Sequence, residues 1–257
     1  MSRGYTLIEL LITMAIFIFA TLTFSRFFIA EHHIYAVQEA DTEMLQTSRN
    51  VLNILSRELM LTGYGLPSQI SGITKFKKDE LEFRTNLRDI TSSMAYAAIP
   101  DQNILRVQDG TGRSFKKNDV IVICDTITTH RCEEHTLSEN GTNNAITLTS
   151  GINEAFPEGS RIDLINTIYY RYSGSRKELQ RKIDRGVWES IADNIPSEGL
   201  IFSYKDKFNN TPVSSSDICR IDIILTVESF RTDVYSEENS GYWRSGAKSS
   251  VALRNYL

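Results

Sequence analysis

The longest stretch without a helix-breaking residue runs from Tyr5 to Thr62 and contains neither glycine nor proline. Because these two residues interrupt helices most strongly, the whole stretch can form a single helix. At about 1.5 Å per residue, its roughly 58 residues would extend about 85 Å, well beyond the thickness of a bilayer. Part of such a helix must therefore project into solvent or onto a partner.

The first half of this stretch is apolar enough to cross a membrane. Residues 10–25 carry no charge, and the apolar segment extends upstream to Tyr5 if one acid, Glu9, is tolerated. A membrane-spanning helix needs about 20 such residues. The positive charge before the segment predicts, by the positive-inside rule, that the bulk of the chain lies outside the cytoplasm. A cleaved secretory signal would instead need a longer basic region and an A-x-A-like site, which residues 25–30 do not provide.

The second half of the stretch is amphipathic. Its apolar residues recur at spacings of three, four and seven, which predicts one buried stripe on a helix. The stripe comprises Val37, Met44, Leu45, Val51, Leu52, Leu55 and Leu59. Gly63 to Pro67 then end the helix, because glycine suits the left-handed position after a helix and proline commonly follows.

Downstream of the helix, the sequence predicts antiparallel β-structure. Short runs of β-forming residues are separated by clusters of Asn, Gly, Ser and Asp. The expected strands are 81–84, 104–107, 120–124, 145–149, 161–165, 167–172, 179–183, 200–204 and 218–228. Residues 236–250 are polar and rich in Gly and Ser, and we expect a mobile loop there. The fold class is therefore α+β, with a long helix packed on an antiparallel β-sheet domain.

The segment GYTLIELLITMAIF, residues 4–17, resembles the N-terminal signature of type IV pilins and type II secretion pseudopilins. In that family a prepilin peptidase cuts after the glycine, the new aromatic N-terminal residue is N-methylated, and a glutamate stands fifth in the mature chain. The resemblance places these features at Gly4, Tyr5 and Glu9. Tyr5 replaces the commoner phenylalanine, an aromatic change that the peptidase should still accept.

The resemblance also implies a domain organisation. It predicts a leader at 1–4, a helix at 5–62 that crosses the inner membrane over about 5–30, and an extracytoplasmic α+β domain at 63–257. Assembly into a filament at the cell surface would follow, with other pilins as partners through the helix. Many pilins carry a proline in the second half of the membrane segment; this chain has none, so helix melting during assembly is not inferred.

Glu9 is the one ionisable residue within the apolar run. A carboxylate inside a membrane costs several kcal/mol unless it is paired or reaches the interface, so it marks a functional site by default. After cleavage, the amine of Tyr5 would lie about 6 Å along the same helix, poorly placed for a tight pair. A neighbouring subunit could present its own N-terminal amine to Glu9 instead, and this pairing would set the register between the two subunits. Alternatively, the Glu9 carboxylate only reaches water at the headgroups and interacts favourably with the helix dipole at the N-terminal end of the helix.

Three further segments resemble PilW-type minor pilins and the J-type minor pseudopilin of type II secretion. They are SRELMLTGYGLP at 56–67, IYYRYSG with ELQRK at 168–182, and VALRN at 251–255. The resemblance implies a minor pilin that acts in initiation or at the tip of a type IV pilus. A J-type pseudopilin is the nearest alternative, and a membrane-anchored adhesin or enzyme with a pilin-like anchor is another. The sequence does not choose between the pilus and the secretion machine.

The three cysteines, Cys124, Cys132 and Cys219, fall in the part expected outside the cytoplasm, where thiols tend to oxidise. Cys124 and Cys132 are close enough in sequence for a disulfide between them to close one short loop, and we expect this disulfide. Three pairings remain formally open. His130 and His135 interleave with the pair as C-x5-H-x-C-x2-H, but the spacing matches no familiar zinc knuckle, and no metal or other cofactor is expected.

No catalytic motif is found: a nucleophile elbow, H-E-x-x-H and a Walker P-loop are all absent from the sequence, and we expect no enzyme activity. A net charge of −4 gives no bulk attraction to nucleic acid. Tyr169, Tyr170 and Tyr172 with Arg171 could stack on DNA bases, but alternating aromatics on a strand more often pack across strands. Nucleic acid is therefore not an expected partner.

Overall fold

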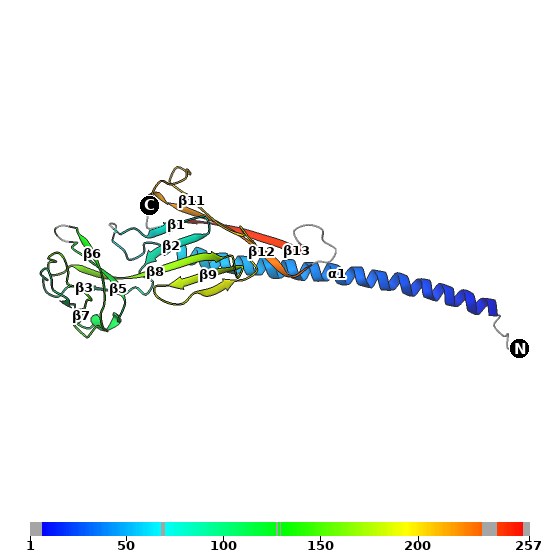
Figure 1. The fold of residues 1–257 in the computed structure, drawn as a ribbon, viewed down its shortest axis with the longest axis horizontal. Coiled ribbons are helices and arrows are strands. Elements are labelled where there is room, and N and C mark those ends of the chain that lie inside the picture. The colour runs from blue at the N-terminus through cyan, green and yellow to red at the C-terminus, as the bar shows by residue number, and fades with distance from the viewer. Residues whose placement is uncertain (1–6, 68–69, 127, 129, 233–240, 254–257) are drawn as a thin grey trace.

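The protein is described here by a computed structural model, which covers residues 7–67, 70–126, 128, 130–232 and 241–253. The helix α1 spans Leu7–Leu59, and the short 3₁₀ helices η1 and η2 span Gly112–Ser114 and Ser215–Asp217. The strands are β1 (Ile73–Phe76), β2 (Glu80–Thr85), β3 (Thr91–Ser93), β4 (Ile104–Arg106), β5 (Val120–Cys124), β6 (Cys132–Thr136), β7 (Ala145–Thr147), β8 (Arg161–Ser173), β9 (Glu178–Ile183), β10 (Glu189–Ala192), β11 (Leu200–Lys205), β12 (Arg220–Thr232) and β13 (Tyr242–Ala252). The expected α+β fold is confirmed, since every strand pair is antiparallel and the sheets pack on one long helix (Figure 1).

The second half of α1 buries the predicted apolar stripe. Met44, Val51, Leu52, Leu55 and Leu59 are buried, whereas the other two members, Val37 and Leu45, are half-buried. The helix ends at Leu59, so the predicted end at residue 62 is three residues too late, and turns follow before β1. Gly63 then adopts a positive φ of 74° and donates its N–H to the carbonyl of Arg84 at 2.8 Å. A left-handed glycine therefore redirects the chain from the helix onto β2.

β8 is the central strand of the main sheet. Its second half pairs with β2 and β9, and its first half pairs with β3 and β5. The prediction of two strands, 161–165 and 167–172, is wrong, because one 13-residue strand covers both. Asn166, between them, stays buried within the strand because its side chain is satisfied: it accepts the N–H of Leu87 at 3.2 Å and donates to Asp184 at 2.8 Å.

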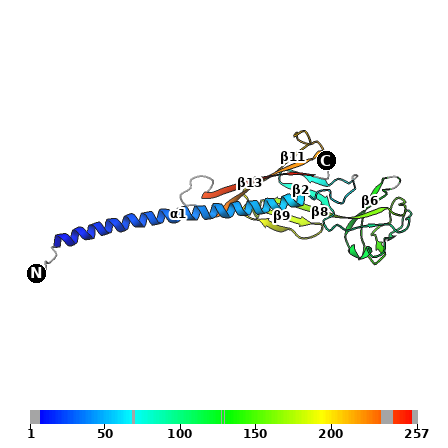
Figure 2. The same ribbon diagram turned by 180° about the vertical axis from the view of Figure 1, so that it is seen from behind.

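The domain has two main hydrophobic cores, one on each half of β8. In the helix-side core, α1 packs against β2, the second half of β8, β9 and the β11–β12–β13 sheet. The second core lies in what we call the distal lobe, residues 90–164, and includes Leu105, Phe115, Ile121 and Phe156. Figures 1 and 2 show the distal lobe beyond the C-terminal end of α1, at the opposite end of the molecule from the N-terminus.

The prediction of a mobile loop over 236–250 is wrong for residues 242–250, which belong to β13; residues 236–240 lie outside the described part of the chain. β13 pairs with β12 and packs along α1. The hydroxyls of Ser249 and Ser56 approach to 2.9 Å, which shows how closely strand and helix meet. Small side chains permit this approach, so the composition typical of a loop here serves close packing of a strand against a helix.

Candidate functional site

The N-terminal half of α1 presents apolar side chains to its surroundings in every direction. Leu11, Ile16 and Phe24 are examples, each more than half exposed. The helix is long and apolar enough to cross a membrane by length and composition. The hydroxyls of Thr21 and Thr23 donate to the carbonyls four residues earlier at 2.8 Å, so these polar groups need no water. A helix with this surface is suited to a lipid environment or to packing against other apolar helices.

Glu9 lies in the first turn of α1 and is exposed along the helix. A carboxylate at this end of a helix is favoured by the partial positive charge of the unpaired N–H groups. Gly4 and Tyr5, the predicted cleavage and methylation positions, lie outside the described residues. Glu9 therefore lies close to the predicted cleavage position. Apolar side chains of the same helix surround it.

A second polar site joins α1 to the sheet and was not predicted from the sequence. Glu58 accepts two hydrogen bonds from the guanidinium of Arg181 on β9, Nη2 to Oε1 at 2.5 Å and Nε to Oε2 at 3.0 Å. The hydroxyl of Tyr170 on β8 donates to the same carboxylate at 2.5 Å. Burial raises the pKa of Tyr170 far above its ordinary value, and the charge of Glu58 raises it further, so the phenol remains a donor.

These contacts form what we call the Glu58 clamp, made of Glu58, Tyr170 and Arg181. The side chains of Glu58 and Arg181 are only 17% and 18% exposed, so the ion pair is largely removed from water. A bidentate arginine–carboxylate pair in such surroundings fixes geometry more strongly than an exposed pair does. The clamp therefore holds the last turn of the helix against the sheet in one orientation.

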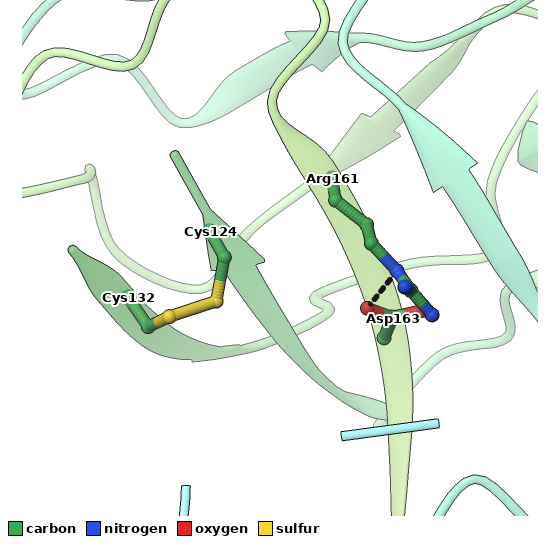
Figure 3. Close-up of a disulfide and its surroundings, with 4 residues drawn as sticks. All are labelled: Cys124, Cys132, Arg161 and Asp163. Atoms are coloured by element: carbon green, nitrogen blue, oxygen red, sulfur yellow. Dashed lines mark ion pairs between the residues drawn. A yellow bond between two sulfur atoms is a disulfide. The ribbon is translucent and has the colours of Figure 1, made fainter. Parts of the chain in front are cut away.

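A disulfide joins Cys124 at the end of β5 to Cys132 at the start of β6 (Figure 3). The two residues face each other across the antiparallel pair, with their Cα atoms 4.2 Å apart. Cys219 is free and half-buried, immediately before the start of β12. The pairing expected from the sequence is thus the one that the structure contains, and the bond closes the loop between the two strands at the distal lobe.

We predict that Cys132→Ser lowers the free energy of unfolding by about 2 to 3 kcal/mol, because the open chain regains the conformational freedom of the short loop. Urea unfolding of the two proteins measures the difference. Cys219→Ser is the matched control, since it removes a half-buried thiol without opening a loop. Non-reducing peptide mapping that finds Cys124 and Cys132 both as free thiols, with one zinc ion bound per chain, would contradict the assignment.

An ion pair between two residues of the same strand lies on β8 beside the disulfide. The Nε of Arg161 is 2.7 Å from Oδ2 of Asp163, and the dashed line in Figure 3 marks this pair. Asp163 is buried, and burial raises the pKa of its carboxyl above the ordinary value, although Arg161 opposes this shift. The contact places the charge of Arg161 against this buried carboxyl, at the position on β8 that pairs with Cys124.

The histidines near the disulfide are not gathered into a metal site among the described residues. His135 is buried, and its Nε2 lies 3.0 Å from Oε2 of Glu133. Burial alone would raise the pKa of Glu133, but hydrogen bonds from the backbone of Asn153 and from His135 lower it overall. His130, whose φ is +53°, lies in the loop that the disulfide closes. Both sulfurs are committed to the disulfide, so they cannot serve as thiolate ligands.

The tyrosines of β8 face opposite sides of the sheet. Tyr170 belongs to the Glu58 clamp, and Tyr172 donates its hydroxyl to the carbonyl of Ile195 at 3.1 Å. On the other face, the ammonium of Lys182 lies 4.2 Å from the ring centroid of Tyr169, its cross-strand neighbour. The guanidinium of Arg171 lies 3.8 Å above the ring of Trp188. These aromatic rings are engaged within the protein, as cross-strand packing predicts.

Comparison with known proteins gives a match at the N-terminal segment only. A family model described as the prokaryotic N-terminal methylation motif matches residues 1–24. No curated protein sequence matches the chain. The match and the length and apolar composition of α1 support an N-terminal helix that anchors the chain in a membrane. Within that class, the methylation motif supports a type IV pilin or pseudopilin, for which prepilin peptidase processing and assembly with other pilins are the general properties.

Proposed function

We propose that the protein is a minor pilin of the PilW type, which acts at the tip of a type IV pilus or in the initiation of its assembly. After cleavage by prepilin peptidase, the helix anchors it in the inner membrane with the globular domain outside the cytoplasm. It then joins other pilins through the apolar surface of α1. The chain acts by assembly rather than by catalysis, and no cofactor or nucleic acid takes part.

The observation that carries this proposal is the position of the distal lobe. The lobe has its own core and projects beyond the C-terminal end of α1, roughly in line with the helix (Figures 1 and 2). A subunit within a filament shaft has further subunits above it, and a lobe placed there occupies space that those neighbours need. At the tip, nothing lies above. The architecture is therefore better suited to the first-assembled end than to a repeating position.

The tip position is tested by labelling. An epitope inserted between Asp109 and Gly110, which are exposed in a turn of the distal lobe, should remain accessible without disturbing the core. We expect antibody-coupled gold at one end of sheared filaments and absence of surface pili when the gene is deleted. Gold at intervals along the shaft would contradict the tip position. Loss of protein secretion with pili intact would assign the chain to a type II secretion system instead.

We propose that Glu9 sets the register of assembly. In this scheme its carboxylate pairs with the N-terminal amine that cleavage creates on a neighbouring subunit. In an apolar environment such a pair is strongly favoured over a single unpaired charge, so only the correct axial offset between helices satisfies both groups. The location of Glu9 in the first turn of an exposed apolar helix makes it reachable by a neighbouring helix.

We predict that the mature protein begins at Tyr5 with an N-methylated amine. Intact-mass measurement of protein purified from membranes decides this, because removal of residues 1–4 and addition of one methyl group give a unique mass. Gly4→Asp should block the cut by placing a charged side chain where the peptidase family requires glycine, and the unprocessed mass should accumulate. A mature species that retains Met1, or that begins after residue 25, would exclude this processing scheme.

A further inference from the structure

The paired strands β12 and β13 form a ribbon that reaches back along α1 toward the N-terminus, as both ribbon views show. Contacts at two points fix its course. The hydroxyls of Ser249 and Ser56 lie 2.9 Å apart, and much nearer the N-terminus the rings of Trp243 and His33 have centroids 6.3 Å apart. The ribbon thus covers the helix from its last turns down to the boundary of its apolar half.

That boundary is where the membrane surface would lie. The apolar half of α1 ends near residue 30, so His33 stands three residues beyond it, or about 4.5 Å by helical rise. The headgroup layer on each side of a bilayer is about 5 to 8 Å thick. Because the ring of Trp243 contacts that of His33, its indole would lie close to this headgroup layer.

The side chains at this end of the ribbon suit such a layer. We define the ribbon end as Phe230, Tyr242 and Trp243. Phe230 is 75% exposed, an unfavourable position for its ring in water, and Tyr242 and Trp243 are half-buried. The ammonium of Lys177 lies 5.7 Å from the ring of Tyr242. Tyrosine and tryptophan concentrate at membrane interfaces, where the ring meets apolar chains and the polar atom meets headgroups.

We propose that the ribbon end is a membrane-docking surface that rests in the outer headgroup layer of the inner membrane. It provides a second contact with the bilayer besides the transmembrane helix. A helix alone leaves the domain free to tilt, whereas two contacts at the same level hold the domain at one height and orientation before the subunit leaves the membrane. The proposal rests on the membrane anchoring in the proposed function, because the depth of Trp243 is set by the apolar half of α1.

The chain offers a direct test, because it contains two tryptophans, Trp188 and Trp243. Trp188 packs against Arg171 on the sheet, remote from the apolar half of α1. The full-length variants Trp188→Phe and Trp243→Phe each leave one reporter. Each is reconstituted into phosphatidylcholine vesicles with bromine at a shallow or a deep acyl position. We expect the shallow label to lower Trp243 fluorescence by roughly half, with a smaller effect from the deep label and none on Trp188.

A matched pair of exposed phenylalanines tests whether the ribbon end makes the contact. Phe230→Ser, measured with Trp243 as the reporter, should reduce the quenching at least about twofold by removing apolar surface that enters the layer. Phe208→Ser is the control: Phe208 is 71% exposed but lies in the loop between β11 and β12, at the other end of β12. It should leave the quenching unchanged. Unaltered circular dichroism in both variants excludes unfolding as the cause.

The outcomes separate this proposal from the anchoring on which it depends. If the protein floats with the vesicles on a density gradient but Trp243 is not quenched, the ribbon end does not touch lipid and the docking surface is wrong. The docking surface is also wrong if Trp243 is shielded from an aqueous quencher only at high protein density, since a neighbouring subunit would then be the occupant. If the protein does not float, the membrane anchoring itself fails.

Discussion

Glu9→Gln is expected to leave leader cleavage and membrane insertion intact and to prevent the subunit from joining a filament. Gln preserves the size of the side chain and removes a charge that the membrane disfavours, so the helix should insert as before. In the proposed assembly, however, the amine of the neighbouring subunit would be left buried without a counter-charge. Loss of one partner of a buried pair costs about 3 to 5 kcal/mol, which lowers incorporation by at least about a hundredfold.

Two measurements on the same mutant test this. N-terminal sequencing reports cleavage, and crosslinking to other pilins reports incorporation. Glu39→Gln is the matched control, because it removes an exposed carboxylate from the same helix beyond the apolar half. It should behave as the wild type in both assays. Normal cleavage together with normal crosslinking of Glu9→Gln would show that Glu9 serves only the start of the helix, and the register mechanism would have to be abandoned.

Glu58→Ala should destabilise the globular domain by about 2 to 4 kcal/mol. The change leaves the largely buried guanidinium of Arg181 without its counter-charge and removes the acceptor of the Tyr170 hydroxyl. Because the clamp joins the helix end to β8 and β9, the loss should loosen the helix from the sheet. Chemical unfolding of the detergent-solubilised full chain, followed by circular dichroism, measures the free energy.

Arg57→Ala is the matched control for the clamp, since Arg57 is the preceding residue and its side chain is exposed. It should change stability by no more than about 0.5 kcal/mol. A double-mutant cycle with Arg181→Ala then isolates the pairwise contribution of Glu58 and Arg181, expected to be about 1 kcal/mol or more. A coupling energy near zero between Glu58 and Arg181 would show that their pairing does not stabilise the domain and only follows from the packing around it.

The elements predicted correctly are those with long or regular patterns. The glycine- and proline-free run predicted α1, and the buried stripe followed from spacings of three and four, because both depend on residues close in sequence. β5 was predicted with its observed bounds, 120–124, since five apolar residues in a row fit a strand buried on both faces. The strands β1, β3, β6 and β10 were missed, because they are short, polar or both, and pairing with neighbours makes them strands.

Two functional arrangements were beyond sequence reasoning for a common reason. The Glu58 clamp joins residues more than a hundred positions apart, and no local pattern marks an acid that will meet an arginine on a distant strand. Similarly, the Gly- and Ser-rich composition of 242–250 is typical of a loop, and only the neighbouring helix shows why a strand there needs small side chains. In both cases the partner that gives the residue its role comes from another part of the chain.

The features at the N-terminal end of this protein follow from its sequence alone: a methylation motif, an acid in an apolar run, and a helix longer than a membrane span needs. These features are local, because a motif, an apolar run and a helical pattern each depend on residues that are close together in sequence. The position of the domain relative to that helix, in contrast, follows from the folded structure. Three features depend on contacts between segments that are distant in sequence: the clamp at Glu58, the distal lobe beyond the helix end, and the ribbon that returns to His33. Each contact closes a long loop of chain, and no local sequence pattern shows which segments will meet.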